Sequence, residues 1–158
     1  MKQTIVNQIH QSLLKNGKTV AVAESCSGGL ASSLLTQASG SSQSFILGVV
    51  VYSNQAKIKT LKIPPSLLAK KGAVSSEIAL RLAQNVRKLA KSDFGIGITG
   101  IAGPSGGTPK KPVGTVFIAV SSHRENISKE FHFKGSRHTI RNKTALKSLE
   151  LLKELIIR

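Results

Sequence analysis

The chain has 158 residues, 40% of them hydrophobic, which matches a single domain with a substantial buried core. No apolar run approaches the roughly 20 residues of a membrane-spanning helix and the first residues lack the apolar region of a secretory signal, so we expect a cytoplasmic protein with no membrane partner. The net charge of +16 suits an anionic small molecule, whereas a nucleic-acid partner is disfavoured because the basic residues are spread along the chain and aromatic residues make up only 4%.

The first part of the chain has the pattern of a β-α-β unit. Residues 4–16 carry apolar side chains at helical spacing and end at Asn16-Gly17, a typical helix stop. The continuous apolar run 19–23 predicts a buried strand, residues 30–38 predict a helix, and residues 45–52 predict a second buried strand. We therefore expect a packing helix followed by strand, helix and strand.

The second part adds further helices and three more strands. A helical pattern after the second strand is interrupted at Pro64-Pro65, and an amphipathic helix capped by Ser75 or Ser76 follows and covers one face of the sheet. Strands are predicted at 94–99, 115–121 and 127–133, the last two as a hairpin, and a final helix closes the chain.

The segment 23–29 (AESCSGG) falls on the turn between the first strand and its helix. Ser25, on this turn, would therefore lie at the exposed mouth of the sheet. Free amides at the helix start favour negative charge there, and glycine permits a ligand to approach the backbone closely. The alternative is that Ser25 or Ser27 is only an N-cap. Cys26 is an activated thiol or a buried inert one, and we favour the inert one.

A second polar turn, residues 52–57, follows the next strand, with Asn54 as a candidate N-cap and Lys57 in the first helical turn. A helix N-terminus disfavours the positive charge of Lys57 and would lower its pKa if the side chain is partly buried. An uncharged lysine is a competent base for a serine hydroxyl, and Tyr52 could orient it or relay a proton. The alternative is an ordinary surface lysine. Both turns lie at carboxyl ends of strands, where open α/β sheets place their sites.

The loop 100–114 is long and rich in glycine and proline, which is typical of a functional loop. It lacks the Gly-Lys-Ser/Thr ending of a P-loop. Arg137 at the start of the last helix is a candidate anion clamp or a surface arginine. The single cysteine and four scattered histidines offer no metal-ligand spacing, so no metal is expected.

Several segments, in order along nearly the whole chain, resemble one family. They are 23–29 (AESCSGG), 48–57 (GVVVYSNQAK), 72–77 (GAVSSE), 99–107 (TGIAGPSGG) and 111–115 (KPVGT). The chain is similar in these segments to the CinA C-terminal domain family, the nicotinamide-nucleotide amidohydrolases. The resemblance implies a single α/β domain over residues 1–158, a three-layer α/β/α sandwich with a mixed, mostly parallel sheet. It also implies hydrolysis of the carboxamide of nicotinamide mononucleotide to nicotinate mononucleotide and ammonia, in pyridine nucleotide recycling, without a cofactor.

Carried over to this sequence, the resemblance makes Ser25 the nucleophile and Lys57 the general base, with Tyr52 beside them. Further positions around the substrate are Ser27, Gly28, Gly29, Ser42, Thr99, Gly100 and Arg137. Arg141, one helical turn after Arg137, is the alternative to it. Larger family members also have an N-terminal molybdopterin-binding-like domain, whose activity is not inferred for this chain.

The residues themselves suit this chemistry. Lys57 would take the Ser25 proton, the Gly28 and Gly29 amides would stabilise the oxyanion, and Arg137 with the loop 100–107 would hold a phosphate. Two alternatives remain open: a non-catalytic nucleotide-binding or competence-associated protein, and a nucleic-acid binder attracted by charge. A homo-oligomer is expected, and the preferred pyridine nucleotide is left open.

Overall fold

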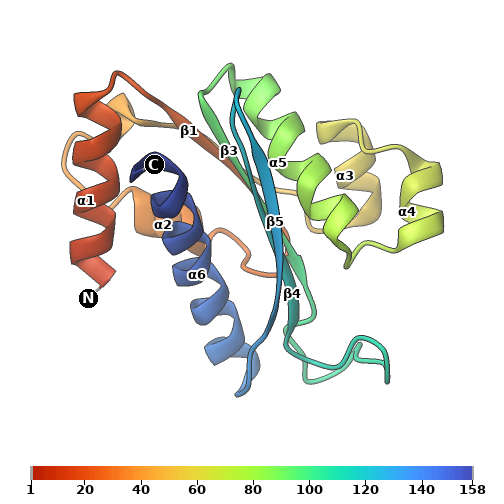
Figure 1. The fold of residues 1–158 in the computed structure, drawn as a ribbon. Helices are drawn as coiled ribbons and strands as arrows, with labels where there is room; N and C mark the ends of the chain where they lie inside the picture. The colour runs from red at the N-terminus through yellow and green to blue at the C-terminus, as the bar shows by residue number, and fades with distance from the viewer. Residues whose placement is uncertain (1, 158) are drawn as a thin grey trace.

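A computed structural model describes residues 2–157 and places five strands in one sheet (Figure 1). The spatial order is β2-β1-β3-β4-β5. The strands are β1 (Val20–Glu24), β2 (Phe45–Val50), β3 (Phe94–Gly100), β4 (Thr115–Ser121) and β5 (Asn126–His132). β1 runs parallel to both β2 and β3, whereas β3, β4 and β5 pair antiparallel, so the mixed sheet is confirmed.

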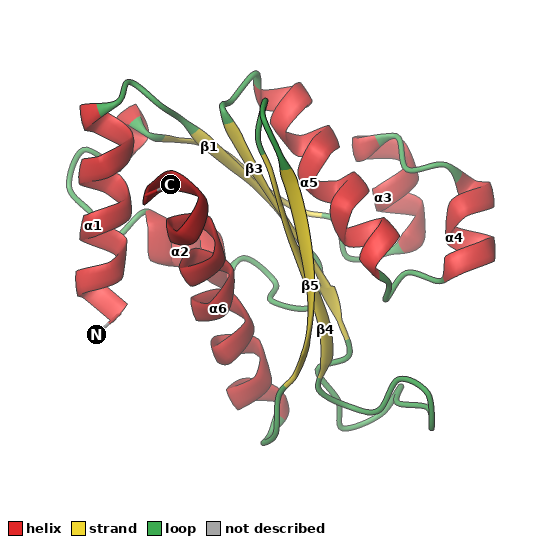
Figure 2. Ribbon diagram, in the orientation of Figure 1, coloured by secondary structure: helices red, strands yellow, loops and turns green. Residues whose placement is uncertain are grey.

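Helices cover both faces of this sheet, which confirms the three-layer α/β/α sandwich (Figure 2). One layer holds α1 (Lys2–Lys15), α2 (Leu30–Leu35) and α6 (Arg137–Ile157), and the other holds α3 (Asn54–Leu61), α4 (Pro65–Lys71) and α5 (Ser76–Ala90). Strand β1 supplies both cores because its side chains alternate. Val20 and Val22 belong to the core under α1, α2 and α6, and Ala21 and Ala23 belong to the core under α3 and α5.

The helix starts near the predicted site follow from local capping. Ser75 caps α5 with its hydroxyl 3.4 Å from the Ile78 amide, one of the two caps that the sequence left open. Ser53, and not Asn54, caps α3, because its hydroxyl accepts a hydrogen bond from the Ala56 amide at 3.0 Å. Helix α3 ends at Leu61, and α4, which the sequence analysis did not predict, begins at Pro65 with proline in its first turn.

Two glycines let α5 pack directly on β3. A Cβ atom at Gly95 or Gly97 would lie 2.1 Å from the carbonyl oxygen of Ala83 or Ala79, respectively, in α5. Glycine is therefore required where helix and strand backbones meet. This close packing holds the central strand β3 and hence the position of its carboxyl end.

The carboxyl ends of the three parallel strands lie at one edge of the sheet. Glu24, the last residue of β1, is in register with Val50, the last of β2, and Ala23 is in register with Gly97 of β3. The turns after β1 and β2 and the loop after β3 therefore meet at this edge. None of the helices in residues 2–157 combines the length and apolar character that crossing a membrane requires.

Candidate active site

A cavity of about 270 Å³ opens at this edge of the sheet. It is formed by the turns after β1 and β2, the segment between α4 and α5, the loop after β3 and the start of α6. Its lining residues are Ser25, Cys26, Tyr52, Asn54, Lys57, Ala73, Val74, Thr99, Gly100, Ile101, Ala102, Gly103, Ser105, Gly106 and Arg137. Of the site residues expected from the sequence, six are in this lining: Ser25, Tyr52, Lys57, Thr99, Gly100 and Arg137.

Ser25 and Lys57 lie in contact at the buried end of the cavity. Lys57 Nζ is 3.2 Å from Ser25 Oγ and 3.2 Å from the Tyr52 carbonyl oxygen. Lys57 is only 2% exposed, and no carboxylate of residues 2–157 forms an ion pair with it. Burial lowers the pKa of Lys57 below its ordinary value of 10.5. The site thus holds a serine hydroxyl beside a lysine whose surroundings favour the uncharged form.

The turn that carries Ser25 is anchored on both sides. The Ser25 amide donates to the Ile98 carbonyl of β3 at 3.1 Å, and the Gly28 amide donates back to the Ser25 carbonyl at 3.1 Å. Gly28 and Gly29 have φ of +61° and +98°, which glycine adopts without strain. The Gly29 amide donates to the buried carboxylate of Glu24 at 3.0 Å. Both glycine amides, expected from the sequence to face an oxyanion, are therefore used inside the turn.

Cys26 shares the turn with Ser25 but is not activated. Burial raises the pKa of its thiol to about 12, so the thiol is protonated at neutral pH. This agrees with the inert cysteine favoured from the sequence. The Cys26 amide donates to no oxygen within the part of the chain that the structure describes. The amides of Cys26 and Ser27 interact with the Cys26 thiol, and no main-chain oxygen of residues 2–157 competes for the Cys26 amide, which directly follows Ser25.

Tyr52 and Arg137 meet at the rim of the cavity. Arg137 donates from Nη2 to the Tyr52 hydroxyl and from Nη1 to the Gly103 carbonyl, both at 2.8 Å. Tyr52 is 58% exposed, and its hydrogen bond with Lys57 is made by its main-chain carbonyl. Arg141 instead donates to the Ser27 carbonyl at 3.3 Å and is absent from the cavity lining. Of the two arginines that the sequence left open, Arg137 is the one at the cavity.

Four expected site residues lie outside the cavity lining. Ser27, Gly28 and Gly29 shape the turn behind Ser25 and are not in the lining. Ser42 lies in the short 3₁₀ helix η1 (Ser41–Gln43), which precedes β2 and so stands at its amino end, away from the site. The structure thus separates Ser42 from the other residues that the family resemblance grouped around the substrate.

Two wall residues that the sequence analysis did not single out are Ala73 and Val74, between α4 and α5. The Thr99 hydroxyl donates to the Ala73 carbonyl at 2.8 Å, and Lys111 donates to the Val74 carbonyl at 2.5 Å. Asn54, expected only as a cap, also lines the cavity. A missed signal was that Asn54 and Lys57 lie three residues apart, which places both on one face of a helix.

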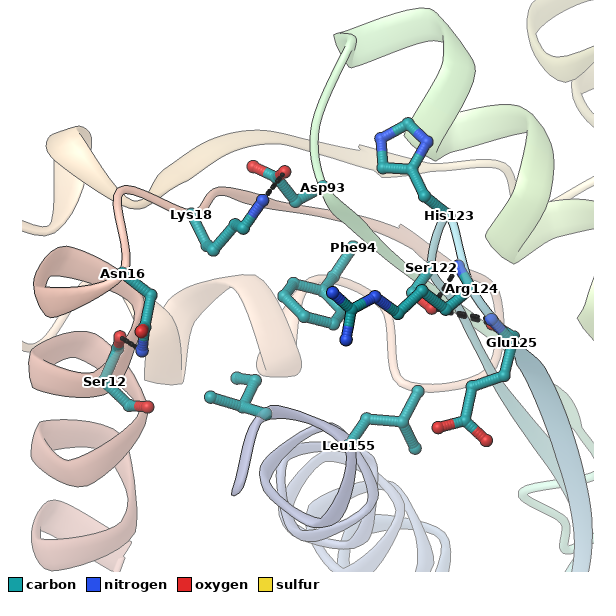
Figure 3. Close-up of a pocket in the computed structure, with 11 residues that line it drawn as sticks. Ser12, Asn16, Lys18, Asp93, Phe94, Ser122, His123, Arg124, Glu125 and Leu155 are labelled. Carbon is teal, nitrogen blue, oxygen red and sulfur yellow. Dashed lines mark hydrogen bonds and ion pairs between the residues drawn. The ribbon is translucent and has the colours of Figure 1, made fainter. Parts of the chain in front are cut away.

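A second cavity, of about 380 Å³, lies at the other end of the sheet (Figure 3). Two of its charged side chains pair with each other: Lys18 contacts Asp93 at 2.9 Å, and Asp93 also accepts the Thr19 amide. Figure 3 shows Phe94 and Leu155 between the charged groups. No serine there lies against a buried base, so the first cavity is the better candidate for catalysis. Among the described residues, no group of three or more His, Cys, Asp or Glu is arranged to hold a metal ion.

Comparison with known proteins gives one consistent family. The family model described as the CinA C-terminal domain matches residues 2–156. A CinA-like protein of Geobacter metallireducens is 44% identical over 155 residues, covering 98% of this chain and 38% of that protein. A putative competence-damage inducible protein of a Thermoanaerobacter species is 48% identical over 145 residues, covering 92% of this chain and 35% of that protein. The chain therefore spans well under half the length of these relatives.

Solved structures show the same fold. A competence/damage inducible protein from Agrobacterium tumefaciens superposes with a TM-score of 0.95 at 35% identity, covering 98% of this chain and 94% of that one. A CinA superfamily protein from Escherichia coli superposes with a TM-score of 0.94 at 30% identity, covering 98% and 90%.

Proposed function

The chain belongs to the CinA C-terminal domain family, and from this premise we propose that it hydrolyses the carboxamide of nicotinamide mononucleotide to nicotinate mononucleotide and ammonia. The observation that carries the proposal is the contact of Ser25 Oγ with Lys57 Nζ at 3.2 Å, in a cavity where Lys57 is buried without a carboxylate partner among residues 2–157. A serine paired with an uncharged amine is a nucleophile suited to acyl transfer.

The first half of the reaction forms an acyl-enzyme. Lys57, uncharged, takes the proton of Ser25 as the hydroxyl oxygen attacks the carboxamide carbon. The carbonyl oxygen becomes an oxyanion, for which the Cys26 amide is the adjacent donor. An amide on the residue after the nucleophile has the same role in other serine hydrolases. This assignment replaces the Gly28 and Gly29 amides, which are occupied within the turn.

The second half releases the products. The Lys57 ammonium returns its proton to the carboxamide nitrogen, the carbon–nitrogen bond breaks, and ammonia leaves an ester on Ser25. Water then loses a proton to Lys57 and attacks the ester, and Ser25 regains its proton as nicotinate mononucleotide departs. Lys57 acts in both halves because it is the titratable side chain in contact with Ser25.

The rim of the cavity suits the phosphate of the mononucleotide. The Arg137 guanidinium is held there by Tyr52 and Gly103, so an anion would meet a cation whose orientation is already set. This supports a role for Tyr52 in orienting Arg137. A proton relay through the Tyr52 hydroxyl lacks support, because that hydroxyl is bonded to Arg137 and not to Lys57.

Replacing the nucleophile tests the proposal directly. Ser25→Ala should reduce ammonia release from nicotinamide mononucleotide by at least about 10³-fold, because loss of a nucleophile removes the covalent route. The measurement is ammonia release by the purified proteins, with thermal unfolding as the check on folding. Ser33→Ala, on the exposed face of α2, is the matched control and should behave as wild type. Turnover retained in Ser25→Ala would remove Ser25 from the mechanism. A wild-type protein inactive on every pyridine nucleotide would instead favour a non-catalytic binding role.

A further inference from the structure

We propose that Glu24 is a positioning residue for the Ser25 nucleophile, acting through a buried carboxylate that organises the turn from residue 25 to residue 32. The inference rests on the proposed function in one respect, that Ser25 is the nucleophile. Glu24 is the last residue of β1, directly before Ser25, and is 0% exposed. The sequence analysis did not assign it a role.

The Glu24 carboxylate accepts five hydrogen bonds from the turn after β1 and the first residues of α2. Oε2 accepts from Ser27 Oγ at 2.6 Å, the Gly29 amide at 3.0 Å and the Ala31 amide at 3.1 Å. Oε1 accepts from the Ser32 amide at 2.8 Å and Ser32 Oγ at 2.7 Å. In each of the five bonds an amide nitrogen or a hydroxyl donates and a carboxylate oxygen accepts.

This arrangement differs from ordinary helix capping. A single Ser or Asp at the N-cap satisfies one or two helix-start amides at little cost, whereas a buried carboxylate without a cationic partner is costly to desolvate. No lysine or arginine of residues 2–157 forms an ion pair with Glu24. The five hydrogen bonds offset that cost only while residues 27–32 keep this conformation, so the carboxylate enforces one geometry of the turn.

The consequence for catalysis concerns which amides stay available. Glu24 uses the amides of Gly29, Ala31 and Ser32, and the Gly28 amide is bonded to the Ser25 carbonyl. The Cys26 amide remains beside the nucleophile. Because Glu24 binds residues on both sides of the turn's glycines, it holds Ser25 Oγ and the Cys26 amide in a fixed relation. A loosened turn would lose that relation while the rest of the cavity stays intact.

The isosteric variant Glu24→Gln changes this network specifically. Whichever way the glutamine amide is oriented, its NH₂ group replaces an oxygen that accepts two or three hydrogen bonds, and so faces donors. We expect kcat to fall at least about tenfold, equal to ~1.4 kcal/mol of transition-state stabilisation, and KM to stay within about threefold. A merely structural role would lower the melting temperature but leave kcat per folded molecule unchanged.

The second readout is independent of the natural substrate. A fluorophosphonate probe bonds its phosphorus to Ser25 Oγ and expels fluoride, while Lys57 takes the serine proton. Its rate of labelling therefore reports how well the nucleophile is poised, whatever the natural substrate. Ser25→Ala should not be labelled, and Glu24→Gln should be labelled more slowly than wild type by a factor similar to the loss in kcat.

Two further variants keep the test decisive. Ser32→Ala removes one hydroxyl donor but keeps the carboxylate. It is the milder change, which serves if Glu24→Gln fails to fold, and it should slow labelling about two- to fivefold. Ser148→Ala removes a buried hydroxyl that donates to the Ala145 carbonyl in α6, and it should lose stability without slowing labelling. Labelling of wild type without ammonia release would refute the proposed substrate, and the labelling rates of the variants would still test the role of Glu24. Wild-type labelling rates in Glu24→Gln and Ser32→Ala, or no labelling of wild type at all, would overturn the role of Glu24.

Discussion

The environment of Lys57 follows from its position in α3. Ser53 caps the helix, and Lys57 follows one turn later with its amide on the Ser53 carbonyl, so its side chain extends under the turn that carries Ser25. Two hydrogen bonds, to Ser25 Oγ and the Tyr52 carbonyl, replace water around its nitrogen. Neither partner carries a charge. Burial therefore works against the ammonium form without an opposing ion pair, which is the condition that a lysine base requires.

This environment predicts a pH-dependent stability difference between wild type and Lys57→Met. The pKa of Lys57 is lower in the folded protein than its ordinary 10.5, so between these two values the unfolded chain binds more protons and wild-type stability rises with pH. Below the folded-state pKa the cost of burying the charge is present in full. Lys57→Met should there be more stable than wild type by about 1 kcal/mol, or roughly 2–4 °C in melting temperature.

Thermal unfolding of the two proteins across neutral to alkaline pH measures this difference. The advantage of Lys57→Met should shrink as the pH rises through the folded-state pKa toward 10.5. Lys59→Met, on the same helix but at an exposed position, is the control and should show no such trend. An advantage of Lys57→Met that stays constant with pH would mean that Lys57 is not held in an environment that opposes its charge.

At the scale of elements, the cavity wall is assembled from segments distant in sequence. The loop between β3 and β4 extends beyond the sheet (Figure 1) and is attached to the segment between α4 and α5 by Lys111. Lys111 Nζ donates to the Val74 carbonyl at 2.5 Å and to the Lys71 carbonyl at 3.4 Å. Its own amide is held by the Thr108 hydroxyl at 3.0 Å. Lys111 thus joins two walls of the site without contacting Ser25.

Removing this attachment should affect binding more than chemistry. Lys111→Ala frees the loop from the Val74 carbonyl, so we expect KM for the nucleotide to rise about three- to tenfold while kcat changes less than about twofold. Lys110→Ala removes the same charge from the exposed neighbouring residue and should leave KM near the wild-type value. Steady-state kinetics of both variants measure the effect. An equal rise in KM for both would assign it to lost charge, and a collapse of kcat would place Lys111 in the catalytic step.

The sequence predicted the elements that local patterns determine. Four of the five strands follow from apolar runs, and β5 was predicted as the hairpin partner of β4. The turns after β1 and β2 were correctly placed at one edge, because parallel strands connected through helices bring their carboxyl ends together. The start of α6 at Arg137 also agrees with prediction. These features depend on residues close together in the sequence.

What the sequence did not predict depends on contacts between distant segments. Short α4 has only seven residues, starting after Pro64, and the proline pair was taken as an interruption alone. The walls at Ala73 and Val74 are held by Thr99 and Lys111, which are more than twenty residues away. The Gly28 and Gly29 amides were predicted to stabilise an oxyanion. The sequence gives no local signal that the side chain of Glu24, at the end of a strand, points toward the helix start and accepts hydrogen bonds there.

At the scale of the whole molecule, the charge distribution has one dominant sign. The seven acidic residues are set against 23 lysines and arginines. Several acids are already engaged at the surface: Asp93 pairs with Lys18, Glu77 with Lys71, and Glu154 with Lys129. Glu24 is buried. The cationic side chains outnumber the acidic ones by sixteen, and the resulting field attracts anions over distances of about the Debye length.

This field predicts opposite salt dependences for two related ligands. Nicotinamide mononucleotide is a net anion because its phosphate outweighs the pyridinium charge, whereas nicotinamide riboside lacks the phosphate and is a cation. Raising the salt from about 20 to about 300 mM shortens the Debye length and should raise KM for the mononucleotide several-fold. The inhibition constant of the riboside, measured by competition, should stay constant or fall. Arg137→Met should weaken the salt dependence of KM for the mononucleotide without abolishing it. The variant removes the contact of Arg137 with the phosphate, whereas the other cations remain. Equal salt dependence of the two ligands would show that the net charge of +16 does not act on substrate capture.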